Sequence, residues 1–291
     1  MRHLLHPNTR LAIGAVAISF SGVWVTIAQV SASSSAFYRV FFGLLFLIVF
    51  AIQRRDITPP RPSHFFLALL CGLLFALDLY CWHKSIRLVG PGLATLLGNC
   101  QVFVLAGVGI FLLKERYSGL LLLALPLAAM GLFFIIGLEW PDTTANHRLG
   151  VYFGLATALF YACYIISLKY LSGVSTSTIQ PMLLVSFTTA IFLGIYILSG
   201  KQTLVISDLP SLFSLLSLGF FSQCLGWLLI ATSLPRTNTT SAGLILLLQP
   251  SLAFFWDVLF FARPTSWLNW LGVAITLGAI YLGLLSRREK V

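Results

Sequence analysis

The chain is organised as long apolar segments separated by short polar ones. Ten apolar segments of about 20 residues can be marked. They are Leu11–Val30, Ala36–Ile52, His64–His83, Leu93–Leu113, Tyr117–Leu138, Leu149–Tyr170, Ile179–Leu198, Leu209–Thr232, Ser241–Phe261 and Trp267–Leu285. A helix of about 20 residues crosses the roughly 30 Å of hydrocarbon in a bilayer. The pattern therefore predicts an all-α polytopic membrane protein with ten transmembrane helices, and Gly90-Pro91-Gly92 predicts a turn before the fourth.

Composition excludes a soluble protein. Of the 291 residues, 58% are hydrophobic and 9% are charged, with a mean hydropathy of +0.95. A soluble domain carries about 25% charged residues, so these side chains could not cover a water-facing surface of this size. The sequence also contains no phosphate-binding loop, nucleophile elbow or zinc-protease motif. We therefore expect neither an enzyme nor a cofactor.

The cysteines and histidines give no sign of a metal site. The five cysteines all lie in apolar segments, and no two have the C-x-x-C spacing. The five histidines are scattered or lie at segment ends. Buried cysteine behaves mostly as a small hydrophobic residue. We expect no bound metal.

The positive charge is distributed as in a membrane protein. The net charge is +10, but lysines and arginines fall between apolar segments, which favours membrane topology over nucleic-acid binding. One set of loops, with both termini, holds Arg2, Arg10, Arg54, Arg55, Arg61, Lys114, Arg116, Lys169, Arg236, Arg287, Arg288 and Lys290. The alternate loops hold Lys84, Arg87, Arg148, Lys201 and Arg263. Both termini are therefore predicted to be cytoplasmic, with Trp140, Trp267 and Trp270 near the outer interface.

The second half of the chain repeats the first weakly. Residue pairs 148 positions apart match in kind: Gln101 with Gln249, Ser85 with Ser233, and Ser118 with Ser266. Pairs 140 apart match in the first and sixth segments: Gly14 with Gly154, Phe20 with Phe160, and Trp24 with Tyr164. Five segments per half is an odd number, so the second half must enter the membrane from the opposite side. We predict two inverted five-helix repeats, residues 1–146 and 147–291, around a central cavity, as in secondary transporters.

Polar side chains within the segments are the candidates for binding a solute, because such groups are costly in lipid. Asp78 and Trp82 are four residues apart and share one helix face. A carboxylate beside an aromatic ring can hold an ammonium group; a structural carboxylate bonded to a neighbouring helix is the alternative. Arg39 can attract a carboxylate, pair with an acid such as Asp257, or extend to the outer surface, and we favour a structural ion pair.

Amides and aromatic side chains complete the candidate site. Asn99, Gln101, Gln223 and Gln249 lie near segment centres, where they suit a zwitterion or bond neighbouring helices. Trp24, Tyr161, Tyr164 and Trp227 offer stacking and cation–π contacts, although such residues also pack in cores or face lipid. The three-residue spacing of Tyr161 and Tyr164 allows both to face one cavity. Glu115, at a membrane edge, is interpreted as solvated or as a helix-end residue.

Three motifs resemble the EamA-type members of the drug/metabolite transporter superfamily. Residues 36–42, AFYRVFF, resemble that family's arginine-containing second span, and residues 112–118, LLKERYS, resemble the end of its fourth. Gln249-Pro250, thirteen residues before Arg263, matches the proline-to-glutamate interval that ends each family repeat. The likeness covers the chain as two five-helix halves and is greatest to the YddG-type aromatic amino-acid exporters. It implies aromatic positions in the site at Tyr161 and Trp227.

The chain also departs from the family pattern. Val102 replaces the proline expected in the fourth span, Lys114 replaces a glycine, and Arg263 replaces the second glutamate. The sequence therefore does not predict whether both halves bend alike.

The predicted function is export of small amphipathic metabolites, with aromatic or neutral amino acids favoured, from a bacterial cytoplasm across the inner membrane. The expected substrate-binding residues are Trp24, Asp78, Trp82, Asn99, Gln101, Tyr161, Tyr164, Gln223, Trp227 and Gln249. The alternatives are a sugar-phosphate or nucleotide-sugar antiporter, which would need paired cations in the cavity, and a non-transporting receptor or assembly subunit. The expected partners are a small-molecule substrate and the bilayer; the sequence does not determine the oligomeric state, and a monomer is compatible with it.

Acidic residues are scarce at membrane depth. The first and sixth segments contain no Asp or Glu, and only Asp78 and Asp257 lie well inside apolar segments. A proton carrier must alternate between protonated and ionised forms within the working pH range. We predict that flux follows the substrate gradient and that Asp78 binds substrate without carrying protons.

Overall fold

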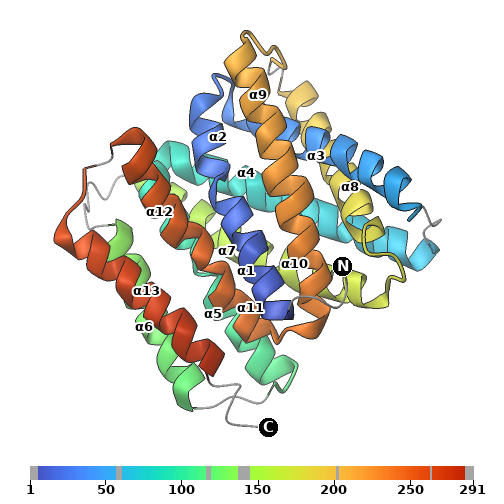
Figure 1. The fold of residues 1–291 in the computed structure, drawn as a ribbon. Helices are drawn as coiled ribbons and strands as arrows, with labels where there is room; N and C mark the ends of the chain where they lie inside the picture. Colours follow the sequence, from blue (N-terminus) through green and yellow to red (C-terminus); the bar gives the residue numbers. More distant parts are fainter. Residues whose placement is uncertain are drawn as a thin grey trace. The chain divides into compact units, whose positions relative to one another are not determined.

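All regular secondary structure in the computed structural model is helical over the residues it describes, 6–56, 61–115, 119–136, 145–200, 203–262 and 264–285 (Figure 1). Within that part of the chain, eight helices are long and apolar enough to cross a membrane, and Leu97–Leu112 and Gly119–Ile135 are shorter apolar helices. The predicted class is confirmed, while the count of ten crossings stays a prediction. Some residues used in the sequence argument lie outside the described ranges: Arg2, Arg116, Ser118, Trp140, Lys201, Arg263, Arg287, Arg288 and Lys290.

The helices follow the apolar segments closely. They are α1 (Pro7–Ser19), α2 (Ser21–Ile27), α3 (Ala32–Arg54), α4 (Pro62–Asn99), α5 (Gln101–Gly107), the π-helix η1 (Val108–Leu112), α6 (Gly119–Ile136), α7 (Ala145–Val174), α8 (Gln180–Ser199), α9 (Leu209–Ser217), the π-helix η2 (Leu218–Gly226), α10 (Trp227–Ser233), the short 3₁₀ helix η3 (Leu234–Arg236), α11 (Thr239–Leu246), α12 (Leu248–Phe261) and α13 (Trp267–Leu285). The observed bounds of α13 coincide with the predicted ones.

One predicted boundary is wrong. The turn expected at Gly90-Pro91-Gly92 lies inside α4, which runs unbroken for 38 residues, and the helix is interrupted only at Cys100. Glycine and proline disfavour a helix locally by about 1 and 3 kcal/mol, but such propensities are routinely overridden by the structural context, here the helical segments on both sides. A signal that marks a turn in a water-soluble protein is therefore weaker between two apolar segments.

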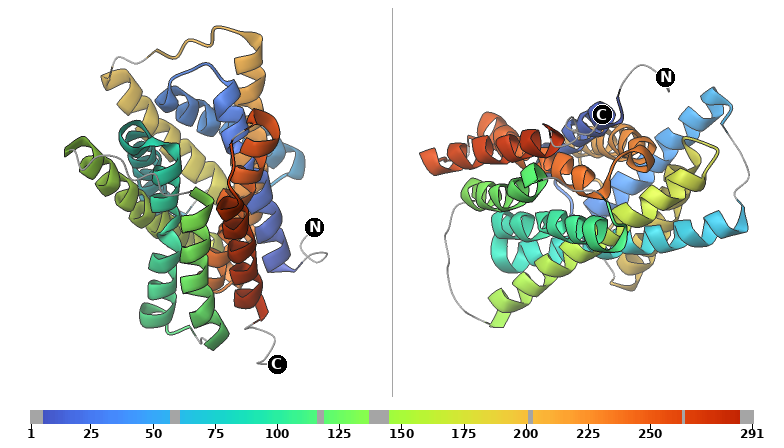
Figure 2. Two further views of the ribbon diagram at one scale, coloured as in Figure 1. Left: turned by 90° about the vertical axis from the view of Figure 1, so that its left-hand side faces the viewer. Right: turned by 90° about the horizontal axis from the view of Figure 1, so that it is seen from below.

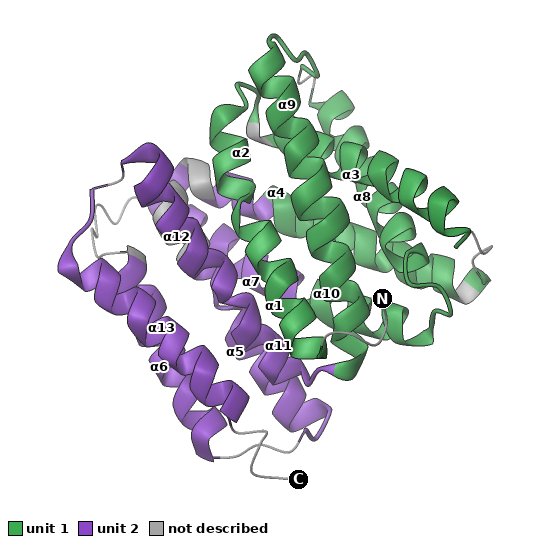
Figure 3. Ribbon diagram, in the orientation of Figure 1, with its two compact units in different colours: residues 1–80, 163–236 green, residues 81–162, 237–291 purple. Residues whose placement is uncertain are grey.

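The chain forms two compact units, each built from both halves of the sequence (Figure 3). Unit 1 comprises Met1–Tyr80 and Cys163–Arg236, and unit 2 comprises Cys81–Ala162 and Thr237–Val291. The boundaries fall inside α4 and α7, so each of these helices contributes to both units. The units are therefore a different division from the two sequence halves, whose inverted relation stays a prediction.

Unit 1 is held together by α3, which packs on α8, α9 and η2, and by α1, which packs on α10 and η2. Hydroxyl groups join its helices: the Thr188 hydroxyl of α8 donates to the Ala68 carbonyl of α4 at 3.0 Å, and Ser21 donates to Ser222 at 2.8 Å. Lipid is as apolar as the helix surfaces, so the hydrophobic effect does not drive membrane helices together. Hydrogen bonds from hydroxyl groups to a neighbouring helix therefore help to hold unit 1 together.

Unit 2 is built around the antiparallel helix pair α6 and α13, which run side by side in Figure 1 and in both views of Figure 2. Gly131 of α6 faces Gly272 and Thr276 of α13, and a Cβ on Gly272 would lie 2.6 Å from the Gly131 carbonyl oxygen. Glycine is required for this backbone approach. α11 packs on α5, η1 and α13, and Leu132, Leu247 and other apolar side chains fill the core.

Two helix ends in unit 2 share an uncommon backbone geometry. Lys114, after η1, has φ 51°, and Ala262, after α12, has φ 49°. These residues are 148 positions apart, the offset that relates Gln101 to Gln249. A residue in the left-handed backbone conformation ends a helix. For residues other than glycine, this conformation costs about 1–2 kcal/mol of free energy. The shared conformation is thus a structural counterpart of the weak sequence repeat.

Glu115 takes the helix-end role, one of the two roles expected from its position. Its carboxylate accepts the Thr239 N–H at 2.7 Å and the Thr240 N–H at 3.3 Å, so it caps the N-terminus of α11. The Thr240 hydroxyl adds a third donor at 3.4 Å. The first N–H groups of a helix have no hydrogen-bond partner inside the helix, and the helix dipole also stabilises a negative charge at this end.

Candidate functional site

Three aromatic side chains form the centre of unit 1. The Phe75 ring of α4 stacks on Tyr164 of α7 with centroids 4.5 Å apart, and Trp227 of α10 meets Tyr164 edge-on at 4.9 Å and Phe75 at 5.5 Å. No member is more than 2% exposed. Tyr164 and Trp227 were predicted to belong to one site, and the structure brings them into contact. We call these three rings the aromatic cluster.

A charged pair lies beside the aromatic cluster. The Arg39 guanidinium of α3 lies over the Phe75 ring, 5.9 Å from its centroid. Asp78, one helical turn after Phe75, is 7% exposed and interacts electrostatically with Arg39. A buried charge is tolerated when an opposite charge or an aromatic face compensates it. Asp78 is thus an acid that interacts with Arg39 within unit 1, while Asp257 belongs to unit 2. The structural ion pair expected for Arg39 stays a prediction.

Gln223 lies one turn before Trp227, inside the π-helix η2. Its amide Nε2 donates to the Ser186 hydroxyl of α8 at 3.1 Å, while its Oε1 is buried and accepts no hydrogen bond from the described residues. Gly43 of α3 packs directly against the Gln223 side chain, and a Cβ at this glycine would collide with it. Single π-helical segments occur often at functional sites. Here one carries a fully buried amide whose oxygen accepts no hydrogen bond from the described residues.

Trp24 has a different set of neighbours in unit 1. Its ring stacks on Phe221 with centroids 6.4 Å apart, and it packs with a small apolar core around Leu215 and Leu218. The Ser214 hydroxyl donates to the Trp24 carbonyl at 2.6 Å. The indole Nε1 is buried and donates to no described residue. The structure thus leaves Trp24 with a free polar group but does not place it in the aromatic cluster.

Tyr161 and Gln249 meet in unit 2. The Gln249 amide Nε2 of α12 donates to the Tyr161 hydroxyl of α7 at 3.4 Å. Gln101 of α5 is fully buried, and neither its amide nitrogen nor its oxygen has a hydrogen-bond partner among the described residues. An unpartnered buried amide costs about 1–3 kcal/mol. Burial of Gln101 therefore costs folding free energy, because neither polar atom of its amide is hydrogen-bonded within the described residues.

The remaining predicted residues also lie in unit 2. Trp82 is half-buried and meets His83 edge-on at 5.1 Å. Gly98 allows close packing between α4 and α7, because a Cβ there would lie 3.1 Å from the Thr157 methyl group. Asn99, next in the chain, is half-buried at the end of α4. The Thr157 hydroxyl is buried and unpartnered among the described residues.

The contacts separate residues that the sequence grouped together. Tyr161 bonds within unit 2 and Tyr164 packs within unit 1, because the unit boundary crosses α7 between them. A shared cavity for both stays a prediction. Phe75 was missed: it lies three residues before Asp78, on the same helix face, and this spacing is the signal that could have found it.

Two comparisons with known proteins point to a transporter, and a third concerns the fold. Residues 10–137 and 148–285 each match the EamA-like transporter family. A protein of Escherichia coli (strain K12) described as a probable amino-acid metabolite efflux pump is 26% identical over 209 residues, which cover 68% of this chain and 69% of that one. A solved crystal structure superposes with a TM-score of 0.83 over 98% of this chain and 99% of the other, at 14% identity, which shows the fold alone. The two family matches cover most of the sequence, and the chain therefore belongs to the EamA-like transporter family.

Proposed function

We propose that this membrane protein exports amino acids or related metabolites that carry an aromatic or other apolar side chain. The observation that supports this most directly is the aromatic cluster with the Arg39–Asp78 pair beside it. Stacking rings suit an apolar side chain, while a carboxylate and a guanidinium suit the ammonium and carboxylate groups of a zwitterion. The relative described as an amino-acid metabolite efflux pump points to the same substrate class.

The closed packing of the aromatic cluster suggests how binding is coupled to movement. The three rings contact one another and are nearly inaccessible, so a solute can reach them only by replacing ring–ring contacts. Each aromatic pair contributes about 0.5–1.5 kcal/mol, an amount that contacts to a substrate ring can offset. We propose that solute binding separates Trp227 from Phe75 and Tyr164, and that this rearrangement accompanies alternating access between two inverted repeats.

The direct test is counterflow of labelled phenylalanine, tryptophan, leucine and serine, and of a labelled sugar phosphate, into proteoliposomes that contain the purified chain. We expect exchange of the aromatic and apolar amino acids. Trp227→Ala should reduce aromatic flux at least tenfold, and Trp227→Phe should retain part of it. Trp270, which is 41% exposed in unit 2, gives the matched control Trp270→Ala. Wild-type aromatic flux in well-folded Trp227→Ala would contradict the proposal, and exchange of sugar phosphates instead would favour the alternative substrate class.

The chain is proposed to lie in a bacterial inner membrane with both termini in the cytoplasm. The family and the apolar helices support a multi-pass membrane protein, the bacterial relative supports the compartment, and the lysine and arginine count supports the orientation. A reporter fused after Val291 should be active only in its cytoplasmic form. Periplasmic activity would contradict either the orientation or the number of crossings.

We propose further that transport needs no proton gradient. Asp78 interacts electrostatically with Arg39 inside unit 1, and a neighbouring guanidinium favours the ionised form of a carboxylate, which is the form that binds an ammonium group. Pyranine trapped in proteoliposomes would report substrate-dependent pH changes. We expect none, and Asp78→Asn should weaken substrate affinity only. A stoichiometric proton movement that disappears in Asp78→Asn would make Asp78 the coupling residue.

A further inference from the structure

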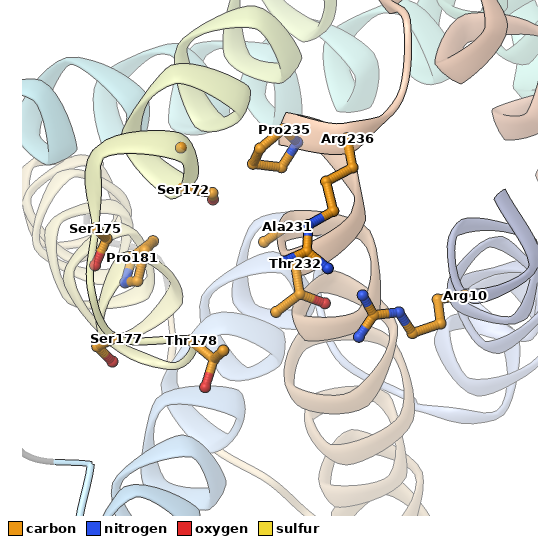
Figure 4. A pocket seen from close by; sticks show the side chains of 11 residues that line it. Arg10, Ser172, Ser175, Ser177, Thr178, Pro181, Ala231, Thr232, Pro235 and Arg236 are labelled. Carbon is orange, nitrogen blue, oxygen red and sulfur yellow. The ribbon is translucent and has the colours of Figure 1, made fainter. Parts of the chain in front are cut away.

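Unit 1 contains a polar cavity whose described lining includes no ring of the aromatic cluster. Its volume is about 180 Å³, and its walls come from the start of α1, the connection between α7 and α8, and the end of α10 with η3 (Figure 4). Arg10 and Arg236 are the charged residues among its described lining. In Figure 4 both guanidinium groups reach into the cavity beside Thr232. Two like charges that converge on one cavity call for an anion between them.

The hydrogen bonds of the walls show which donors are free. The Thr232 hydroxyl donates to the Leu228 carbonyl at 2.9 Å, and the Thr178 hydroxyl donates to the Asp56 carboxylate at 3.1 Å. The Ser175 hydroxyl donates to the Gln180 side chain at 3.1 Å. These three hydroxyl groups have therefore used their hydrogens. The Asp56 carboxylate holds the α7–α8 connection through Thr178 and is not part of the cavity lining.

Four donors remain. Arg10 is 9% exposed, and its buried Nε–H has no acceptor among the described residues. The Ser172 hydroxyl is buried and equally unpartnered in the described chain. The Ser177 oxygen accepts the N–H groups of Ile179 and Gln180 at 3.1 and 2.9 Å, which leaves its own hydrogen to donate. Arg236 is exposed and supplies the second charge at the mouth of the cavity.

The donor set fits one chemical group. It offers two guanidinium groups and two hydroxyl hydrogens, and none of the described lining residues is acidic. Arginine pairs with phosphate through two parallel N–H···O bonds, and serine hydroxyls bond the remaining oxygens. A buried arginine whose Nε–H lacks an acceptor is costly until an anion binds. We propose that this cavity is a binding site for a phosphate group, held by Arg10, Ser172, Ser177 and Arg236.

The phosphate group has two possible sources that share this chemistry. The charge count assigns two lining residues, Arg10 and Arg236, to the cytoplasmic side, where anionic lipid headgroups attract basic residues. A lipid phosphodiester could enter from the bilayer, and a soluble phosphate could enter past Arg236. The site uses none of the residues proposed to bind the exported solute, so the two proposals can fail separately.

Thermal unfolding of the purified full chain tests the site with two probes. The first is inorganic phosphate in detergent, titrated against chloride at constant ionic strength. The second is phosphatidylglycerol, added stepwise to phosphatidylcholine nanodiscs. We expect at least one probe to raise the melting temperature in a saturable way. Loss of one arginine should weaken the apparent affinity on the order of tenfold, since one charge-assisted contact is removed.

Arg10→Gln and Arg236→Gln are the test variants, and Arg54→Gln is the matched control. Arg54 is an exposed arginine at the end of α3 whose guanidinium lies over Phe50, outside the cavity. Arg236 is exposed, so its substitution keeps the test usable if Arg10→Gln folds poorly. Response to phosphate alone would identify a soluble ligand, and response to phosphatidylglycerol alone would identify a lipid headgroup. Equal responses in Arg236→Gln and Arg54→Gln, or no saturable response to either probe, would overturn the proposal.

Discussion

Two helical stretches of unit 2, one ending at Leu112 and the other at Phe261, occupy matching places in the sequence repeat. The first is interrupted at Cys100, just before Gln101, and the second at Leu247, two residues before Gln249. At both interruptions the backbone N–H donates a hydrogen bond to the carbonyl three residues earlier instead of four. The Cys100 N–H donates to the Leu97 carbonyl and the Leu247 N–H donates to the Leu244 carbonyl, each at 3.1 Å.

The bend does not require the same residue in both places. Pro250 lacks an N–H and crowds the carbonyl four residues back, which accounts for the interruption at Leu247. Val102 stands at the corresponding site, yet the first stretch is also interrupted. There the weak helix formers Gly98 and Asn99 precede the break. The question left open by the sequence, whether both halves bend, is answered for these two helices: both are broken beside the matched glutamine.

The side chains differ where the backbones agree. Gln101 is fully buried without a described partner, whereas Gln249 is half-buried and bonded to Tyr161. Glu115 follows the first stretch and caps α11, while the residue at the same offset, Arg263, lies outside the described residues. The repeat has thus kept its backbone geometry and diverged in polarity. Matching positions in the two halves should therefore respond differently to the same substitution.

The largest effect is expected at Glu115. Glu115→Gln removes the charge at the α11 N-terminus and one of the acceptors used by Thr239 and Thr240, so the free energy of unfolding should fall by about 1–2 kcal/mol. The measurement is unfolding in mixed micelles. Lys114→Gln, at the exposed neighbouring residue, is the control. Equal stability of the two variants would show that the cap contributes nothing.

The next largest effect is a difference in the free energy of unfolding between substitutions at Gln101 and at Gln249. Gln249→Leu deletes the bond to Tyr161 and should lower the free energy of unfolding by about 1 kcal/mol. Gln101→Leu replaces an unpartnered buried amide with an apolar side chain of similar size and should leave stability unchanged or raise it. The same unfolding assay compares them. An equal loss in both variants would mean that Gln101 has a bonded role in the folded protein.

The left-handed helix ends should respond alike. Lys114→Gly and Ala262→Gly each relieve a backbone conformation that disfavours residues with a Cβ, so both should raise the free energy of unfolding by roughly 0.5–1 kcal/mol. Ala253→Gly, inside α12, is the control and should lower it by a similar amount. A gain at one end and a loss at the other would show that the shared geometry has different functions in the two halves.

The smallest effect concerns an acid that caps its own helix. Asp208 precedes α9, and the Ser211 N–H and hydroxyl donate to its carboxylate at 2.7 and 2.8 Å, which holds the pKa of Asp208 below its usual range. A lowered pKa in the folded state stabilises the protein above the ordinary pKa of aspartate, about 3.9, and this contribution is lost as pH falls through the folded value.

Asp208→Asn keeps a capping side chain but does not titrate. The difference in melting temperature between pH 6 and pH 3 should therefore be slightly smaller in Asp208→Asn than in the unchanged protein. An identical pH dependence in the two proteins would show that the Asp208 carboxylate makes no measurable contribution.

The sequence predicted the helices well because lipid imposes one rule on all of them. A segment in hydrocarbon must bond its own backbone, so apolar length locates helices such as α13 almost to the residue. The error at Gly90–Gly92 has another cause: local turn propensity was overridden, and these residues lie inside α4. Backbone details within helices, such as the π-helix around Gln223, follow from contacts between helices and leave no trace in hydropathy.

The candidate site was predictable only in part. Tyr164 and Trp227 were selected as mid-span aromatic residues that can stack on a solute, and the structure places them in contact. Phe75 was hidden among 24 phenylalanines, so composition could not mark it. The partner of Arg39 depends on how helices α3 and α4 are rotated against each other, which residue types alone do not encode. Asp78 was chosen as a ligand for a solute, and its electrostatic interaction with Arg39 became visible only in the fold.

The division of the chain into interleaved units has a consequence for biosynthesis. The ribosome releases residues 1–80 into the membrane long before residues 163–236, yet both segments are needed to complete unit 1. Until then, Gly43 has no Gln223 to pack against, and Ala68 lacks the hydroxyl that Thr188 later supplies. Unit 2 also waits for the last part of the chain. A nascent chain that stops near its midpoint therefore leaves both units incomplete. Helix surfaces that pack against protein in the complete chain then face lipid. Quality-control proteases would encounter two incomplete units rather than one folded domain.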